Sequence, residues 1–303
     1  MSAIKLRRHD NECLLFFDFI SEKEAYGLSK QSIENYKKVY DAFRHQMGQN
    51  ITQESINKWI HMMINKCMNP ISINFYISQI RVFAYWLIKN GYCKEFEIKK
   101  IKTQEPQVKT IPDNDVKILL EKPPIKSSFS TYRSWVIINF ILGTGARQST
   151  VRNLRVRDID FDSKEIRYTH LKNKTSAIVP LSPTLERVLR LYLNTWDIGD
   201  GYLFPDIHGG FLTGNALEHS LRNYSVLKGV KHKGAHSLRH TFAKKFILAG
   251  GNALILQRLL THTDLAMTKK YVRLFNDDLH NNYENLCPLD SYQSERLIKK
   301  KRN

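Results

Sequence analysis

The segment from His236 to Tyr271, HSLRHTFAKKFILAGGNALILQRLLTHTDLAMTKKY, is the most informative part of this sequence. Apolar residues recur at helical spacing before Gly250 and again over residues 254–260, so the pattern predicts two helices divided by a glycine pair. A third helix is expected to begin at Asp264 and to carry Tyr271. The ends of these helices would present polar side chains on one side of a small helical cluster.

Two ordinary interpretations of the polar residues in this segment come first. His236 and His240 are spaced as in a zinc-binding helix, but Ser237 occupies the position where that motif has its glutamate. Taken alone, a tyrosine such as Tyr271 is ordinarily a half-buried packing residue. The combined spacing of the histidines, the arginine and the tyrosine is more informative than any one of them.

The combined pattern resembles the signature of the tyrosine recombinases, the phage integrase family. That signature is H-x-L-R-H-T-F, then L-L-G-H, then a tyrosine. Here the three parts are HSLRHTF from His236, LLTH ending at His262, and Tyr271. Thr261 replaces the glycine that the family often has, a change expected to affect only the local turn. The resemblance extends over residues 10–285.

A second motif follows a run that is apolar on nearly all sides, residues 134–142, which predicts a buried helix. An arginine at the end of such a helix is expensive to bury without an anionic partner. Arg147 could therefore be a surface residue or form an ion pair with Asp158 or Asp160. The sequence TGARQS resembles the T-G-x-R box that carries the family's first active-site arginine, which would make Arg147 that residue. Thr150 stands where the family often has an acidic residue.

A β-hairpin is predicted from residues 165–171 and 177–181, joined by a polar turn. Lysines in such a turn usually only keep it solvated. In the family that this sequence resembles, however, a lysine on the hairpin is catalytic and lies eight residues before a proline. Here the proline is Pro180, so the matching residue is Lys172, with Lys174 as the second candidate.

The composition suggests a polyanionic partner. The chain has 303 residues, enough for about two domains, a net charge of +18 and a pI of about 9.7. An acidic membrane surface is the alternative partner, but the basic residues are spread along the whole chain instead of forming one amphipathic helix. No signal peptide or membrane span is expected, and the location predicted is cytoplasmic. The cysteines are far apart and without a C-x-x-C pair, which indicates reduced thiols and no zinc site.

Three parts of the chain are expected. Residues 10–94 read as four amphipathic helices with basic faces, and residues 1–94 resemble the core-binding, SAM-like DNA-binding domain of the family. Residues 95–112 lack periodicity and predict a linker that lets the two domains close around a duplex; an ordered surface loop is the alternative. Residues 113–303 would form the catalytic domain. The fold class predicted is mainly α with a small β-sheet.

The resemblance implies a division of roles in the cleavage of a phosphodiester. Two guanidinium groups would hold the non-bridging oxygens, one histidine would add a third donor, and another would act as general base. The hairpin lysine would protonate the leaving 5′-oxygen, and the tyrosine would attack phosphorus. In that order, the catalytic residues are expected to be Arg147 and Arg239, His262, His236, Lys172 and Tyr271.

This chemistry implies neither a cofactor nor a metal, because the covalent phosphotyrosine conserves the energy of the phosphodiester. The expected partners are double-stranded DNA, a homotetramer in the synaptic complex, and possible accessory DNA-bending or directionality factors. An integrase of a mobile element is favoured over a resolvase of chromosome or plasmid dimers. A type IB topoisomerase and a catalytically silent DNA-binding regulator are the alternatives outside this group.

Overall fold

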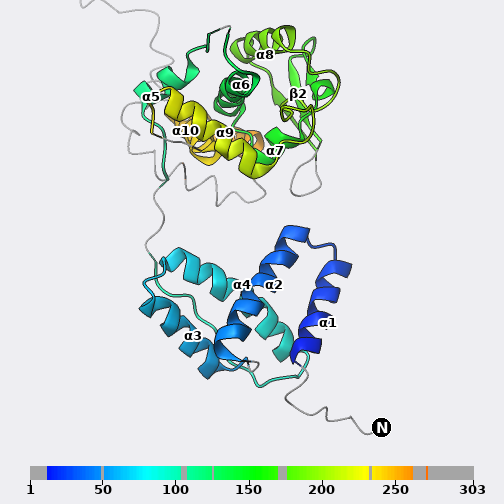
Figure 1. Ribbon diagram of the computed structural model, residues 1–303, viewed down its shortest axis with the longest axis vertical. Coiled ribbons are helices and arrows are strands. Elements are labelled where there is room, and N and C mark those ends of the chain that lie inside the picture. The colour runs from blue at the N-terminus through cyan, green and yellow to red at the C-terminus, as the bar shows by residue number, and fades with distance from the viewer. Residues whose placement is uncertain are drawn as a thin grey trace, which may run out of the picture. The chain divides into compact units, whose positions relative to one another are not determined.

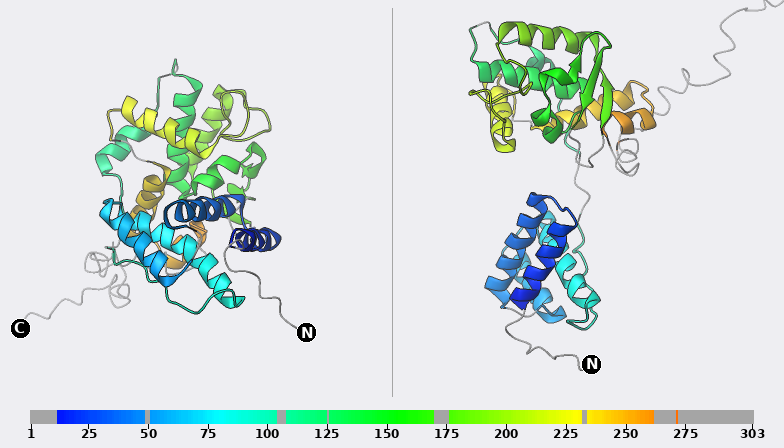
Figure 2. Two further views of the ribbon diagram at one scale, coloured as in Figure 1. Left: turned by 60° about the horizontal axis from the view of Figure 1, so that its bottom comes forward. Right: turned by 90° about the vertical axis from the view of Figure 1, so that its right-hand side faces the viewer.

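A computed structural model describes most of the chain, which divides into two compact units, Met1–Pro106 and Gln107–Asn303. Both units are built mainly from helices, and a three-stranded sheet lies in the second (Figures 1 and 2). This confirms the predicted fold class, mainly α with a small β-sheet. No helix in the described part of the chain is long and apolar enough to cross a membrane. The described residues are 12–48, 51–103, 108–124, 126–169, 176–231, 234–261 and 271.

The first unit is a bundle of four helices, as the sequence predicts. Side chains at the N-caps of three of them accept backbone N–H groups that would otherwise lack a partner, for example Ser29 and Thr52. Aromatic rings fill the core: Phe16 stacks on Tyr40 at 3.8 Å between centroids, and the edge of Phe83 meets Phe16 at 5.0 Å. The helices are α1 (Glu12–Ala25), α2 (Lys30–Met47), α3 (Gln53–Asn65) and α4 (Pro70–Lys89).

The predicted linker, residues 95–112, is anchored at both of its ends. Ile98 is buried in the core of the first unit, and Ile101 packs against that core. Ile111 is buried in the core of the second unit, where its backbone N–H donates to Thr241 Oγ1 at 2.8 Å. The described ends of this segment are therefore ordered by packing and hydrogen bonding.

The second unit is organised around α6 (Phe129–Thr144), which lies in its interior with other helices around it (Figure 1). Its residues are buried on nearly all sides, as the apolar run predicts, and it packs against α8, α9 and α10. The other elements are α5 (Asp113–Leu120), α7 (Gln148–Asn153), the 3-10 helix η1 (Val156–Asp158), β1 (Ile159–Asp160), β2 (Glu165–Tyr168), β3 (Ala177–Pro180), α8 (Pro183–Thr195), α9 (Gly214–Leu227), α10 (Ala235–Leu248) and α11 (Ala253–Leu259).

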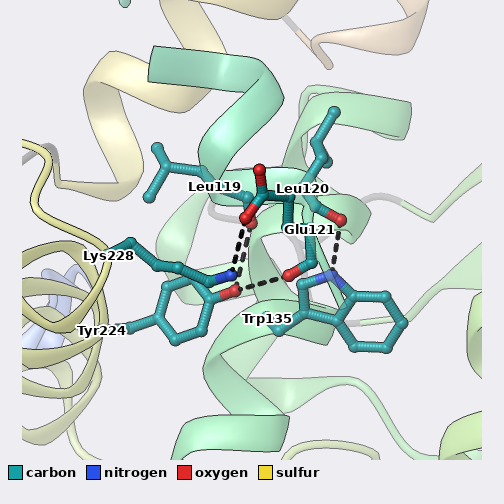
Figure 3. Close-up of polar contacts among 6 residues, drawn as sticks. All are labelled: Leu119, Leu120, Glu121, Trp135, Tyr224 and Lys228. Carbon is teal, nitrogen blue, oxygen red and sulfur yellow. Dashed lines mark hydrogen bonds and ion pairs between the residues drawn. The ribbon is translucent and has the colours of Figure 1, made fainter. Parts of the chain in front are cut away.

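The C-terminal end of α5 is tied to the unit by side chains from two other helices (Figure 3). Trp135 Nε1 donates to the carbonyl oxygen of Leu120 at 2.9 Å, and the hydroxyl of Tyr224 donates to the carbonyls of Leu119 and Glu121. The last carbonyls of a helix have no partner within it, so these bonds satisfy groups that burial would otherwise penalise.

The sheet contains the predicted hairpin and one strand that was not predicted. Strand β2 pairs antiparallel with β3, with Ile166 opposite Val179, and both side chains face the core. The two-residue strand β1 pairs with the other edge of β2. The hairpin strands are shorter than predicted. The turn that holds the predicted Lys172 lies outside the described residues.

Candidate active site

Arg147 stands at the junction between two helices. Helix α6 ends at Gly145, whose φ of +67° is in the left-handed region, and Arg147 occupies the N-cap position of α7. Its guanidinium Nη1 donates to the carbonyl oxygen of Thr261 at 2.9 Å and also bonds the Thr261 hydroxyl. Thr261, which lies 114 positions later in the chain, thus fixes the side chain of Arg147 in the TGAR motif.

The alternative partners considered for Arg147 are engaged elsewhere. The carboxylate of Asp158 accepts the backbone N–H of Arg155 at 2.8 Å, and Asp160 pairs with Arg167 at 3.0 Å. The observed partner of Arg147 is the neutral residue Thr261, which orients the guanidinium without cancelling its charge.

Arg239 is buried on α10 and connects the ends of two other helices. Nη1 donates to the carbonyl oxygen of Gly145, and Nη2 to that of Leu260, each at 2.7 Å. Burial, together with the neighbouring charge of Arg147, lowers the pKa of the Arg239 guanidinium to about 10. The group nevertheless remains protonated at neutral pH. Two cations that influence each other at this depth favour an anion beside them.

Tyr271 lies within this cationic region. Its side chain is only 5% exposed and packs with the buried residues Ala243, Leu256 and Leu260. Burial raises the pKa of the Tyr271 phenol, whereas the positive charges of Arg239 and Arg147 act in the opposite direction. The phenol that the sequence identified as the nucleophile is therefore in electrostatic contact with both predicted phosphate-binding groups.

The two histidines of α10 lie beside the phenol. His240 Nδ1 is 2.6 Å from the Tyr271 hydroxyl, and the rings of His236 and His240 meet edge to face with their centroids 4.2 Å apart. Partial burial and the charge of Arg239 lower the pKa of His236, while Glu218 opposes this change. His236 therefore remains neutral at physiological pH.

The structure thus brings together four of the six predicted catalytic residues, while Lys172 and His262 lie outside the described residues. The four are Arg147, His236, Arg239 and Tyr271. Two residues near the phenol and the first arginine were not predicted to have these contacts. His240 was considered as part of a metal-binding pair and as a member of the HSLRHTF signature, but no contact with the phenol was predicted for it, although its spacing places it one turn after His236. Thr261 was expected only to alter a turn, but it bonds Arg147.

A buried phenol next to two guanidiniums, held by helices that meet around the end of α6, is the arrangement of a tyrosine recombinase catalytic domain. The family model of the "Phage integrase family" matches residues 109–277, which is more than half of the chain. The chain belongs to this family, and it is a tyrosine-type site-specific DNA recombinase.

Curated relatives include recombinases and integrases. The chain is 28% identical over 245 residues to the tyrosine recombinase XerA of Saccharolobus solfataricus, a match that covers 77% of this chain and 78% of the relative. It is 36% identical over 146 residues to the integrase of Escherichia phage 186, which covers 47% of this chain and 38% of that protein.

Solved structures share the fold at low sequence identity. The integrase of the transposon Tn1549 in complex with a circular intermediate DNA has a TM-score of 0.72 at 17% identity, covering 86% of this chain and 94% of that one. A lambda integrase dimer bound to a core site has a TM-score of 0.69 at 13% identity, covering 84% and 96%. At these identities the likeness establishes the fold alone.

Proposed function

We propose that this recombinase cuts and rejoins DNA through a covalent 3′-phosphotyrosine intermediate with Tyr271 as the nucleophile. The observation that carries the proposal is the position of the buried Tyr271 phenol beside Arg239 and Arg147, whose positive charges act against the rise in its pKa that burial causes. A phenol has a pKa near 10 and needs such help to become a nucleophile at neutral pH.

The two arginines would act on the phosphate. Bidentate guanidinium contacts would hold the two non-bridging oxygens and stabilise the negative charge that develops there as the phenolic oxygen approaches. Their neutral backbone partners fix the two guanidiniums before DNA binds, so no reorganisation is needed during the reaction. Lys172 as general acid and His262 as a further donor remain predictions from the resemblance, as does His236 as the base.

The covalent bond formed in the first step preserves the energy of the phosphodiester. The 5′-hydroxyl of a partner strand can therefore attack the phosphotyrosine and reseal the backbone, which requires neither ATP nor a metal. Exchange of strands between two duplexes implies four protomers, and the net charge of +18 suits so large a polyanionic partner. Several solved structures of the fold contain recombinases in complex with DNA.

For the biological role we infer the integration or excision of a mobile element. The likeness to the integrase of Escherichia phage 186, at 36% identity over 146 residues, supports this. The alternative is the resolution of chromosome or plasmid dimers. It is supported by the likeness to tyrosine recombinase XerA, which extends over 77% of the chain.

The first experiment seeks the covalent adduct. The protein is incubated with nicked duplexes tiled across the DNA that flanks its own gene, and the products are separated on denaturing gels. A slowly migrating protein–DNA species that is lost on protease treatment is expected. Tyr271→Phe should abolish it, whereas Tyr92→Phe, which changes an exposed tyrosine of the first unit, should retain it. An adduct that persists in Tyr271→Phe would contradict the proposal.

The same DNA distinguishes the alternatives. A silent regulator would bind with a steep salt dependence and leave every strand intact. A topoisomerase would relax any supercoiled plasmid without exchanging strands. If the mapped cleavage site joins the two ends of a mobile element, the result supports the integrase role. If recombination takes place with a second copy of the same site in a DNA dimer, the result supports the resolvase role.

A further inference from the structure

His240 lies within hydrogen-bonding distance of the nucleophilic oxygen. Its Nδ1 is 2.6 Å from the Tyr271 hydroxyl, with the ring centroids 5.5 Å apart. A separation this short is within the range of hydrogen bonds from hydroxyl groups, and it is the distance expected of a base within reach of the proton it removes. His236 lies behind it, with its ring edge to face against that of His240.

The hydrogen bond between Tyr271 and His240 contains one proton, which the phenol supplies if His240 is the acceptor. A neutral histidine can accept it at Nδ1 only if its own proton is on Nε2. Free phenol and imidazole differ in pKa by about 3.5 units, so the proton stays on Tyr271 while the site is at rest. Removal of the proton must accompany the formation of the bond between the phenolic oxygen and phosphorus, as in general-base catalysis.

Before DNA binds, the charged groups around the pair favour loss of the proton from the phenol but oppose its uptake by an imidazole. Arg239 on the same helix and Arg147 at the start of α7 stabilise the phenolate of Tyr271, and Arg239 also disfavours the imidazolium form of the neighbouring His236. Glu218 on α9 acts in the opposite direction on His236, and Tyr168 on β2 faces Arg239. An arriving phosphate would balance the guanidinium charges, so the imidazole would become a stronger base when the substrate is in place.

We propose that His240 takes the phenolic proton of Tyr271, the role that the family resemblance implies for His236. This proposal rests on the proposed phosphotyrosine chemistry. As the Tyr271 oxygen bonds to phosphorus, its proton moves to His240 Nδ1 and the bond from phosphorus to the 5′-oxygen breaks; that oxygen leaves with a proton from the general acid. In resealing, His240 returns the proton to the departing phenolic oxygen. His236 supports the ring of His240.

The tautomer of His240 tests the proposal without DNA. Side-chain nitrogen spectra of the full-length protein, with ¹⁵N-labelled histidine, are recorded at neutral pH and assigned with the His240→Asn variant. The expected result is a bare Nδ1 and a protonated Nε2, with the Nδ1 signal displaced in Tyr271→Phe. A protonated Nδ1 would overturn the proposal, because His240 would then donate to Tyr271 and could not accept its proton.

The rate of adduct formation supplies the second test, on the nicked duplex that contains the mapped cleavage site. For the wild type, the rate should rise with pH as the base loses its proton and then level off. His240→Asn should slow the step by about 100-fold or more. Its rate should also keep rising with pH, because only phenolate formed in solution equilibrium can then react. His219→Asn, which changes an exposed histidine of α9, should retain the wild-type profile.

These experiments distinguish failure of the His240 assignment from failure of the phosphotyrosine chemistry. If His236→Asn abolishes the plateau and His240→Asn retains it, the base is His236 and this proposal is overturned. If the wild type forms no adduct with any flanking DNA, the proposed function fails, and the nitrogen spectra still report whether His240 accepts the phenolic proton. A variant that does not fold is recognised by its circular dichroism, and the spectra of the wild type then decide.

Discussion

Arg239 donates from Nη2 to the carbonyl oxygen of Leu260 at 2.7 Å, so an arginine predicted to bind phosphate also fixes the end of α11. The same guanidinium holds the carbonyl of Gly145 through Nη1. Arg239 therefore fixes the C-terminal ends of α6 and α11. The residues that follow these two helix ends include Arg147 and Thr261, respectively. One side chain thus combines observed structural support with the predicted binding of phosphate.

Replacement of this arginine by lysine should damage both roles. In Arg239→Lys, one ammonium group cannot reproduce the planar fork that reaches two carbonyls, so one buried acceptor loses its partner. The free energy of unfolding should fall by about 1–3 kcal/mol. Adduct formation should slow by about 100-fold or more. Urea unfolding and the nicked-duplex assay measure the two effects. Arg222→Lys, on the exposed face of α9, is the control, and equal losses in both variants would contradict the assignment.

Gly145 is required by its backbone conformation and by its surroundings. Its φ is +67°, and an added Cβ would lie 2.4 Å from Phe242 Cδ1 and 2.7 Å from Leu260 Cδ2. Gly145→Ala should therefore lose about 1–2 kcal/mol of stability to backbone strain, and overpacking should remove about 1–3 kcal/mol more. Gly250 has a φ of +82° with nothing within 4 Å of an added Cβ, so Gly250→Ala should show the strain alone. If the two variants lose the same free energy of unfolding in urea, Phe242 and Leu260 can move away from the added methyl group at no cost.

Helical periodicity was sufficient to predict most of the architecture, because the buried faces repeat every three to four residues. It located the four helices of the first unit and the all-round apolar helix α6. It did not reveal β1 or α7, which have two and six residues and are too short for a periodic pattern to show. The two hairpin strands were also predicted to be longer than they are in the structure.

The candidate site was predicted in its residue types but not in its contacts. The motifs identified Arg147, Arg239 and Tyr271 as reactive groups. They could not show that His240, and not only His236, approaches the phenol, since that depends on how α10 meets a residue 31 positions later. The bond between Arg147 and Thr261 likewise arises from tertiary packing across 114 positions.

The end of the predicted linker is attached to α10 by one hydroxyl. Thr241 Oγ1 accepts the buried N–H of Ile111 at 2.8 Å and donates to the carbonyl of Ser237 at 2.8 Å. Thr241→Val has a similar shape but leaves that N–H without a partner, which should lower the free energy of unfolding by about 1–3 kcal/mol. Thr241→Ser retains the hydroxyl and should lose less. The prediction fails if the two variants unfold at the same urea concentration.

Thr261 combines backbone strain with a functional hydroxyl. Its φ of +50° is unfavourable for a β-branched residue, yet its side chain bonds Arg147. Thr261→Ser keeps the hydroxyl, whereas Thr261→Ala removes it, and both relieve the branching at Cβ. The hydrogen bond to the hydroxyl that orients Arg147 should contribute about 1 kcal/mol to stabilising the transition state. Adduct formation should therefore be about fivefold slower in Thr261→Ala than in Thr261→Ser. Single-turnover rates at saturating enzyme provide the comparison, and equal rates would assign the positioning of Arg147 to the carbonyl alone.

The lowered pKa of His236 predicts how stability depends on pH. Because the folded-state pKa lies below the ordinary histidine value of about 6.5, the unfolded chain binds a proton at this position before the folded protein does as the pH falls. The contribution of neutral His236 is therefore fully present above about pH 7 and is lost as the pH falls through 6.5 towards the folded pKa. His236→Asn cannot take up this proton, so its free energy of unfolding should fall less than that of the wild type between about pH 7 and 5. Urea unfolding at both pH values measures the difference. An equal decline in the two proteins would mean that His236 has the same proton affinity in both states, and that burial beside Arg239 does not hold it neutral.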